Sequence, residues 1–197
     1  VGVENRPQRR PRTRPIAAGL IGRNLAFALV LACWSVALAL SWTVGRDFIR
    51  VAAAYLLLQV LGSTLLKRVV ILDVMVIALG FILRVIAGGV AINVEVSNWL
   101  FLCTLLLAVF LGFAKRRAEL SSLQRDQPPH RANLSDYSLP MLDQMMSVVA
   151  ASCILAYGLY TVSRETVLHV GTDRLKFTVP FVVYGIFRYL FLIHKRG

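Results

Sequence analysis

Apolar residues along the chain gather in six runs that shorter polar stretches separate. The runs cover about 24–43, 48–66, 72–92, 98–114, 141–162 and 178–194. Each has roughly 17–22 residues, which is the length that a helix needs to cross about 30 Å of hydrocarbon. The pattern therefore predicts an all-α fold, a polytopic transmembrane helix bundle with about six spans.

Composition agrees with this prediction. Of the 197 residues, 57% are hydrophobic and 16% are charged, whereas a soluble domain is nearer half apolar and a quarter charged. The three cysteines each fall inside an apolar run, and their spacing matches no disulfide or zinc pattern. We therefore expect a multi-pass protein of the cell (inner) membrane, surrounded by the lipid bilayer.

The basic residues alternate between the two ends of the predicted spans. Fifteen of the 22 Lys and Arg fall on one side and five on the other. By the positive-inside rule, both termini are cytoplasmic. The chain then divides into a basic cytoplasmic segment, 1–23, and a single transmembrane domain, 24–197, with a cytoplasmic loop at about 115–139. The net charge of +12 is explained by this topology, so we expect no nucleic-acid partner.

The third run carries two charged residues, Asp73 and Arg84. They are eleven residues apart, close to three helical turns, so both lie on one helix face and are predicted to form one wall of a site. An arginine inside a span is costly in lipid, so Arg84 is expected to face protein, water or a bound anion. A buried structural ion pair is the alternative. The pair Gly88-Gly89 is interpreted as a place of close helix packing.

Polar residues that could bind phosphate gather at the predicted cytoplasmic side. They are Arg12, Arg14, Lys67, Asp73, Lys115, Arg116, Glu119, Asp136, Tyr137 and Asp143. Cations bind phosphate oxygens, and carboxylates hold a Mg²⁺ ion that bridges them. Loop lysines and arginines that only follow the topology rule are the alternative. Arg188 lies near the cytoplasmic end and is able to snorkel, and the three histidines show no partner geometry.

Five segments, taken in order, resemble one branch of the UbiA prenyltransferase superfamily, that of decaprenyl-phosphate phosphoribosyltransferase. They are RPIAAG at 14–19, LKRVVILDVMVIALGFILRVIAGGVA at 66–91, AKRRAEL at 114–120, DYSLPMLDQMMSVVAASCILAYGLYTVS at 136–163 and TVPFVVYGIFRYLFLIH at 178–194. The resemblance covers nearly the whole chain. It implies a helical membrane enzyme of nine spans with a cytoplasm-facing cavity.

Members of that branch transfer phosphoribose from phosphoribosyl diphosphate to a polyprenyl phosphate, use Mg²⁺ and supply the arabinose donor for cell-wall polysaccharides. The matching positions here imply substrate-binding roles for Arg14, Lys67, Arg84, Lys115, Arg116, Tyr137 and Arg188. They imply catalytic roles for Asp73 and Glu119, as contacts to a metal or to ribose hydroxyls. The expected partners are these two substrates and the bilayer.

The chain departs from the branch in two places. The family's Asp-rich metal motif, NDxxDxxxD, precedes the RPIAAG segment, but only Glu4 stands near that position here. The metal ligands are therefore unknown. Six spans stand where nine are expected, so the chain is interpreted as truncated at both ends. The alternatives are an aromatic prenyltransferase of the same superfamily, an inactive truncated paralogue or membrane interaction subunit, and a transporter.

Overall fold

The computed structural model describes residues 22–64, 69–126 and 137–196, and the regular structure within them is helical. The elements are α1 (Arg23–Val44), α2 (Arg46–Thr64), α3 (Leu72–Ile92), α4 (Asn98–Asp126), α5 (Leu139–Val162), α6 (Arg164–Val170), a 3₁₀ helix η3 (Arg174–Thr178) and α7 (Val179–Arg196). Within these described residues, six helices are long and apolar enough to cross a membrane. The predicted all-helical, six-span fold is confirmed.

The described residues form two compact units that divide between Val44 and Gly45. In the first, α1 is a single helix with large apolar side chains that are mostly exposed, such as Phe27 and Trp42. The hydroxyls of Ser35 and Ser41 donate hydrogen bonds to the carbonyls four residues earlier. These bonds satisfy polar groups that find no water in a bilayer.

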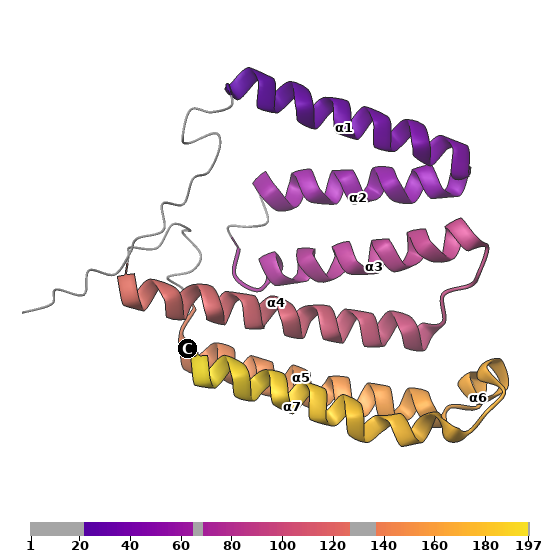
Figure 1. The fold of residues 1–197 in the computed structure, drawn as a ribbon, viewed down its shortest axis with the longest axis vertical. Helices are drawn as coiled ribbons and strands as arrows, with labels where there is room; N and C mark the ends of the chain where they lie inside the picture. Colours follow the sequence, from indigo (N-terminus) through magenta and orange to yellow (C-terminus); the bar gives the residue numbers. More distant parts are fainter. Residues whose placement is uncertain (1–21, 65–68, 127–136, 197) are drawn as a thin grey trace, which may run out of the picture. The chain divides into compact units, whose positions relative to one another are not determined.

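In the second unit, α2, α3, α4 and α5 pack in chain order, and α7 packs beside α5 (Figure 1). The core lies where α3, α4 and α5 meet. Val74, Phe110, Leu142 and Met146 are among its most deeply buried side chains. Helix α4 therefore lies at the centre of the packing, and its two faces contact different neighbours.

Two glycines allow the helices of the second unit to approach closely. A Cβ atom on Gly112 of α4 would lie 2.6 Å from Cγ1 of Val74, and one on Gly62 of α2 would lie 2.6 Å from Cγ1 of Val76. The prediction that Gly88-Gly89 serves close helix packing is wrong. A Cβ atom on Gly88 would meet nothing within 4 Å, and Gly89 instead makes room for the backbone of Val94, where the chain turns after α3.

The structure extends two segments that the apolar pattern left as loops. Helix α4 continues twelve residues beyond the predicted end of its span at Ala114, so the first part of the predicted 115–139 loop is helical. The connection before α7 contains α6 and η3. Helix α5 begins at a built cap, since the Ser138 hydroxyl accepts a hydrogen bond from the Met141 N–H and Pro140 lies in the first turn.

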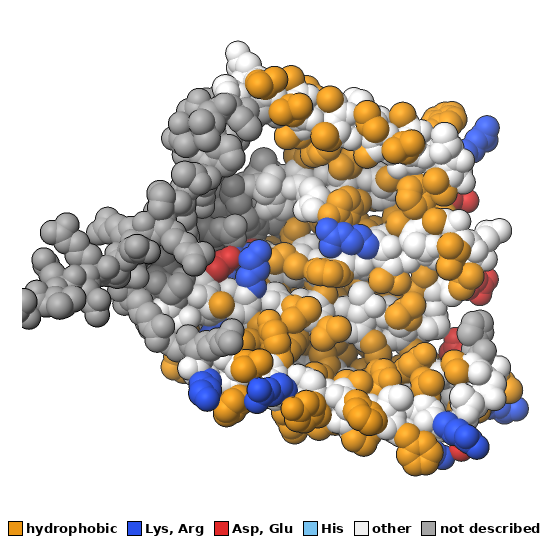
Figure 2. Space-filling model, viewed as in Figure 1, with side chains coloured by type: hydrophobic (Ala, Val, Ile, Leu, Met, Phe, Trp, Pro, Cys, Tyr) orange, Lys and Arg blue, Asp and Glu red, His pale blue; other side chains and the backbone are white. Residues whose placement is uncertain are grey.

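The surface of the second unit suits a lipid environment. Figure 2 shows hydrophobic side chains along the helices, with charged side chains mostly towards helix ends. Leu57, Ile92, Leu155 and Phe181 are each at least 60% exposed. Apolar surface on this scale is unfavourable in water but is solvated by acyl chains. The protein is therefore a multi-pass membrane protein.

Candidate functional site at one end of three helices

The first turn of α3 presents a buried carboxylate. Asp73 is 4% exposed, and its Oδ1 accepts a hydrogen bond from the Val74 N–H at 2.9 Å. The positive end of the helix dipole favours a carboxylate at this position. Just before it, Ile71 has φ 69° and ψ −43°, and the Leu72 N–H donates to the Val70 carbonyl at 2.8 Å. This is a γ-turn of the strained kind, and it fixes where Asp73 enters the helix.

Tyr137, which precedes α5, locks this turn. Its hydroxyl accepts a hydrogen bond from the Ile71 N–H at 2.6 Å and donates one to Asp73 Oδ1 at 3.1 Å. Burial is the largest effect that raises the pKa of Tyr137, and the neighbouring Asp73 charge is the next. Together they bring this pKa to about 12. The hydroxyl is therefore protonated at physiological pH and remains a donor to Asp73.

Arg116 of α4 completes the cluster, which we call the Asp73 cluster: Asp73, Arg116, Glu119 and Tyr137. The Arg116 side chain is 4% exposed, and its Nε lies 2.5 Å from Asp73 Oδ2. Its Nη1 donates to Glu119 Oε2, also at 2.5 Å. The Nε and Oδ2 atoms are close but not aligned as a hydrogen bond, so their contact is an ion pair. One guanidinium is thus held between two carboxylates.

This geometry gives the two carboxylates a shared partner that the sequence did not predict. Asp73 and Glu119 were predicted to contact a metal or ribose, and the structure places both on Arg116. Arg116 keeps further N–H donors, because a guanidinium has five and these contacts involve two nitrogen atoms. Lys115, the preceding residue, is exposed at the same level of α4. The cluster can therefore hold a rigid guanidinium beside a mobile ammonium, a combination that suits phosphate oxygens.

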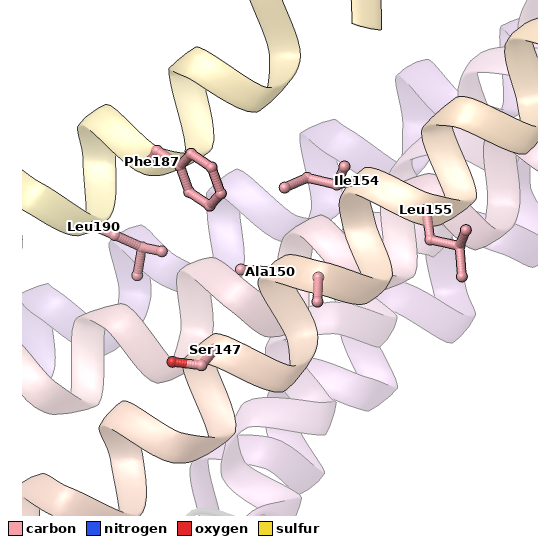
Figure 3. Close-up of a pocket in the computed structure, with 7 residues that line it drawn as sticks. Ser147, Ala150, Ile154, Leu155, Phe187 and Leu190 are labelled. Carbon is pink, nitrogen blue, oxygen red and sulfur yellow. The ribbon is translucent and has the colours of Figure 1, made fainter. Parts of the chain in front are cut away.

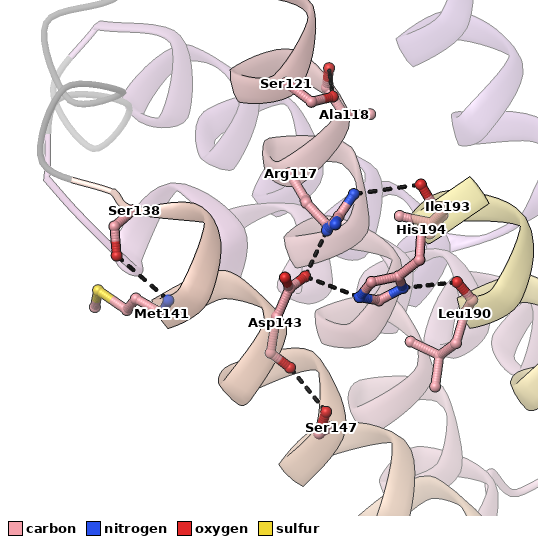
Figure 4. Close-up of polar contacts among 10 residues, drawn as sticks. All are labelled: Arg117, Ala118, Ser121, Ser138, Met141, Asp143, Ser147, Leu190, Ile193 and His194. Atoms are coloured by element: carbon pink, nitrogen blue, oxygen red, sulfur yellow. Dashed lines mark hydrogen bonds and ion pairs between the residues drawn. The ribbon is translucent and has the colours of Figure 1, made fainter. Parts of the chain in front are cut away.

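A second ionic cluster lies on the other face of α4 and links it to α5 and α7 (Figure 4). The Arg117 Nε pairs with Asp143 Oδ1, and its Nη1 donates to the Ile193 carbonyl at 3.3 Å. His194 Nε2 lies 3.2 Å from the same Asp143 oxygen, and its Nδ1 contacts the Leu190 carbonyl at 2.8 Å. Sequence reasoning gave His194 no partner, and only the rotation of α7 against α5 reveals one.

Other predicted site residues lie apart from the Asp73 cluster or outside the described residues. Arg84 contacts Tyr55 of α2, and Arg188 is exposed with its guanidinium 5.6 Å from the centre of the Phe191 ring. Asp73 and Arg84 therefore take partners on opposite neighbours of α3. Arg14 and Lys67 lie outside the residues that the structure describes.

The described residues do not by themselves fit a protein-held Mg²⁺. They contain no group of three His, Cys, Asp or Glu side chains placed to bind a metal. Both oxygens of Asp73 are already engaged, one by Tyr137 and one by Arg116. Mg²⁺ needs nearly octahedral oxygen ligands, of which proteins often supply one or two carboxylates and substrate phosphates the rest.

A cavity of about 390 Å³ lies between α5 and α7 (Figure 3). It is lined by Ser147, Ala150, Ala151, Ile154, Leu155, Phe187 and Leu190. The Ser147 hydroxyl already donates to the Asp143 carbonyl, at 2.8 Å. The lining is thus almost entirely apolar and suits hydrocarbon rather than a charged group.

Comparison with known proteins gives this arrangement a family context. The chain is 32% identical over 154 residues to decaprenyl-phosphate phosphoribosyltransferase of Mycolicibacterium smegmatis, covering 78% of the chain and 48% of that protein. It is 29% identical over 178 residues to the protein of that name from Mycobacterium tuberculosis strain H37Rv, covering 90% of the chain and 58% of the relative. The chain is a homologue of decaprenyl-phosphate phosphoribosyltransferase.

The homology confirms the resemblance that the sequence segments indicated. The decaprenyl-phosphate phosphoribosyltransferase of Corynebacterium glutamicum is 30% identical over 76% of the chain. The chain spans about half the length of these curated relatives. No protein-family model matches it. The four residues of the Asp73 cluster fall in three of the segments that carry the resemblance, with Asp73 in 66–91, Arg116 and Glu119 in 114–120, and Tyr137 in 136–163.

Proposed function

We propose that this protein transfers phosphoribose from phosphoribosyl diphosphate to a polyprenyl phosphate, with decaprenyl phosphate as the acceptor. The reaction takes place at the cytoplasmic face of the cell membrane and supplies a precursor of cell-wall arabinan. Homology to enzymes of that name over most of the chain supports the reaction type. The observation that carries the proposal is the Asp73 cluster. In it, the buried Arg116 pairs with two carboxylates near the predicted cytoplasmic end of the membrane span of α4.

The proposed chemistry is a substitution at C1 of the ribose. An oxygen of the polyprenyl phosphate forms the new bond to C1, the bond from C1 to the diphosphate oxygen breaks, and diphosphate leaves with that electron pair. Negative charge grows on the leaving diphosphate, so fixed cations beside it lower the barrier. We assign Arg116 and Lys115 to its oxygens. Asp73 and Glu119 position Arg116, and Tyr137 positions Asp73.

We further propose that Mg²⁺ accompanies the reaction. The arginine-paired carboxylates of the described residues leave most of its oxygen ligands to the substrate phosphates. The positive-inside rule supports the cytoplasmic side. The ends of α3, α4, α5 and α7 that the positive-inside rule assigns to the cytoplasm lie at one end of the second unit (Figure 1).

The test uses membranes that contain this chain, labelled phosphoribosyl diphosphate, decaprenyl phosphate and Mg²⁺. We expect label in the lipid fraction, dependent on both the acceptor and Mg²⁺. Lys115→Gln should lower the rate about tenfold or more, because it removes a phosphate contact without opening the buried pair. Arg164→Gln, an exposed arginine at the start of α6, is the matched control and should leave the rate unchanged.

Three other results would contradict the proposal in different ways. Transfer of a prenyl group from a prenyl diphosphate to an aromatic ring would identify an aromatic prenyltransferase. No labelled lipid, beside an active M. smegmatis relative, would identify an inactive paralogue or an interaction subunit. Equal rates in the chain and in Lys115→Gln would remove the assignment of Lys115 to the diphosphate.

A further inference from the structure

The apolar cavity between α5 and α7 has a polar contact between these two segments on each side of it. One turn from the lining on each helix, Asp143 Oδ1 and His194 Nε2 lie 3.2 Å apart (Figure 4). Towards the other end, the hydroxyls of Tyr157 and of Thr178, the residue before α7, share a hydrogen bond at 2.8 Å. These two contacts hold the helices around the cavity, so the cavity is part of the fold and not loose packing.

The lining of this cavity disfavours water and suits hydrocarbon. The polar side chain of its described lining, Ser147, already donates its hydroxyl hydrogen to the Asp143 carbonyl, whereas a buried water needs two to four polar partners. An empty space of about 390 Å³ would deprive the lining side chains of dispersion contacts. Leu155 and Phe187 line the cavity and are each more than half exposed, so it opens to the surrounding bilayer. The acyl chain of a membrane lipid is therefore the hydrocarbon available to fill it.

The cavity lies at the depth of one leaflet. Ser147 is eight residues beyond Leu139, the first residue of α5, which is about 12 Å along a helix at 1.5 Å per residue. Leu190 is six residues before Arg196, the last residue of α7, which is about 9 Å. Half of the hydrocarbon thickness is about 15 Å. An acyl chain that enters from the predicted cytoplasmic end thus reaches the cavity before the midplane.

A stripe of α7 leads from the cavity to two positive charges at that end. Phe187 lines the cavity, Phe191 follows one turn later and Lys195 one turn after that, so the three share a helix face. The Lys195 Nζ lies 5.7 Å and the Arg188 guanidinium carbon 5.6 Å from the centre of the Phe191 ring. Both cations are exposed, and no carboxylate of the described residues lies within ion-pair distance of either. Cations close to a bilayer surface attract anionic headgroups.

We propose that this cavity binds one acyl chain of an anionic phospholipid of the cytoplasmic leaflet, with the phosphate group of that lipid against Lys195. The apolar lining holds the chain, and the lysine selects the charge of the headgroup. The bound lipid links α5 to α7 and stabilises their packing. Its site lies between α5 and α7, apart from the Asp73 cluster, and the lipid is not a reactant. The inference therefore does not depend on the proposed reaction.

The experiment uses the full chain in nanodiscs of phosphatidylcholine with a small share of phosphatidylglycerol, which carries a photoactivatable group midway along one acyl chain. After illumination, proteolysis and mass spectrometry locate the labelled residues. We expect label in the segments 147–155 and 187–190. It should exceed the label from a phosphatidylcholine with the same group about fivefold, which is the preference that one cation near the surface gives. Unlabelled phosphatidylglycerol should displace it.

Two variants test the chain and the headgroup separately. Ala151→Phe fills the cavity and should remove the label from both segments. Val162→Phe, at an exposed residue elsewhere on α5, is its matched control and should keep the label. Lys195→Gln should abolish most of the preference for phosphatidylglycerol. Lys176→Gln, which changes a lysine 5.8 Å from the Phe177 ring in η3, at the opposite end of α7, should preserve it.

Four results would overturn the proposal. The first is full labelling of both segments in Ala151→Phe, and the second is equal labelling by the two phospholipids in the unchanged chain. Label spread evenly over the exposed faces of the helices would identify ordinary lipid contact. Displacement by polyprenyl phosphate at a concentration where phosphatidylglycerol has no effect would make the cavity a substrate site. Should Ala151→Phe fail to fold, as judged by its circular dichroism and elution volume, the comparison of the two phospholipids and Lys195→Gln decide.

Discussion

Arg116 and Arg117 are consecutive residues of α4, yet their side chains pair with carboxylates on different neighbouring helices. Arg116 contacts Asp73 of α3, and Arg117 contacts Asp143 of α5. Successive residues of a helix point about 100° apart, so two adjacent arginines can reach two sides of the same helix. The end of α4 is thereby fixed to both neighbours, and the site depends on the rotation of that one helix.

The pair formed by Asp73 and Arg116 should be essential for stability. Asp73→Asn removes one of the two carboxylates that hold the buried Arg116 guanidinium and leaves Glu119 as the other, and an interaction of this kind with a charged group is worth about 1.5–3 kcal/mol. Unfolding of the purified protein in detergent measures the loss. Asp47→Asn breaks the matched ion pair with Arg50, whose side chains are 76% and 73% exposed, and should cost at most about 1 kcal/mol. Equal losses in the two variants would contradict the prediction.

The second cluster should depend more on Asp143 than on His194. Asp143→Asn weakens contacts to both Arg117 and His194, and a hydrogen bond to a charged group is worth about 1.5–3 kcal/mol. His194→Gln removes only a contact of a half-exposed ring and should cost at most about 1 kcal/mol. The free energies of unfolding of both variants and of the double variant give the coupling. A larger loss for His194→Gln would refute this order.

Tyr137 should titrate well above an ordinary tyrosine. Burial and then the Asp73 charge raise its pKa to about 12, against about 10 for an exposed tyrosine. Because the folded-state pKa is the higher one, the stability that the protonated hydroxyl contributes is complete below pH 10. It is lost as the pH rises from about 10 to about 12.

The difference between the ultraviolet titrations of the unchanged chain and Tyr137→Phe isolates this group. We expect the unchanged chain to show a tyrosinate absorbance change near pH 12 that Tyr137→Phe lacks. Asp73→Asn should move that signal to lower pH, because the neighbouring negative charge is removed. If the absorbance change that Tyr137→Phe lacks occurs at or below pH 10, Tyr137 is not buried against Asp73.

The contact of α3 with α4 should be sensitive to the smallest side chain added at Gly112. The Cβ atom of Gly112→Ala would lie 2.6 Å from Val74 Cγ1, and a valine in a helix has little freedom to rotate away. We expect a loss of about 1–3 kcal/mol from overpacking. Gly88→Ala meets nothing within 4 Å and should be neutral or stabilising by up to about 1 kcal/mol. If the clash is the cause, Gly112→Ala should cost less in a Val74→Ala background than in the unchanged chain.

The sequence predicted features that are set within one segment better than contacts between different helices. The apolar runs predicted the spans to within a few residues, because hydrocarbon thickness sets helix length locally. The pattern did not predict that α4 continues to Asp126, since a polar helix beyond the membrane leaves no apolar signal. It also placed Asp73 and Arg84 on one wall of a site, because their spacing puts both on one helix face, whereas in the structure Asp73 contacts α4 and Arg84 contacts α2.

Contacts distant in sequence were the ones that the sequence did not reveal. Arg117 and Asp143 are separated by 26 residues, and Arg117 and Ile193 by 76. These contacts follow from the rotation of three helices, which no single segment encodes. The position of Gly112 shows the same limit, since its role depends on where Val74 of another helix lies.

The γ-turn before α3 stores strain that glycine would relieve. Ile71 has φ 69°, and a β-branched residue there costs about 1–3 kcal/mol. Glycine has no such penalty but loses about 0.5–1 kcal/mol through greater freedom in the unfolded chain. Because Ile71 is 39% exposed, little burial is lost, and Ile71→Gly should be neutral or stabilising by about 1 kcal/mol.

Val69→Gly, at an exposed residue with an ordinary φ, should be destabilising by about 1 kcal/mol. Detergent unfolding of the two variants decides, and a loss in Ile71→Gly as large as that in Val69→Gly would mean that the turn is not strained.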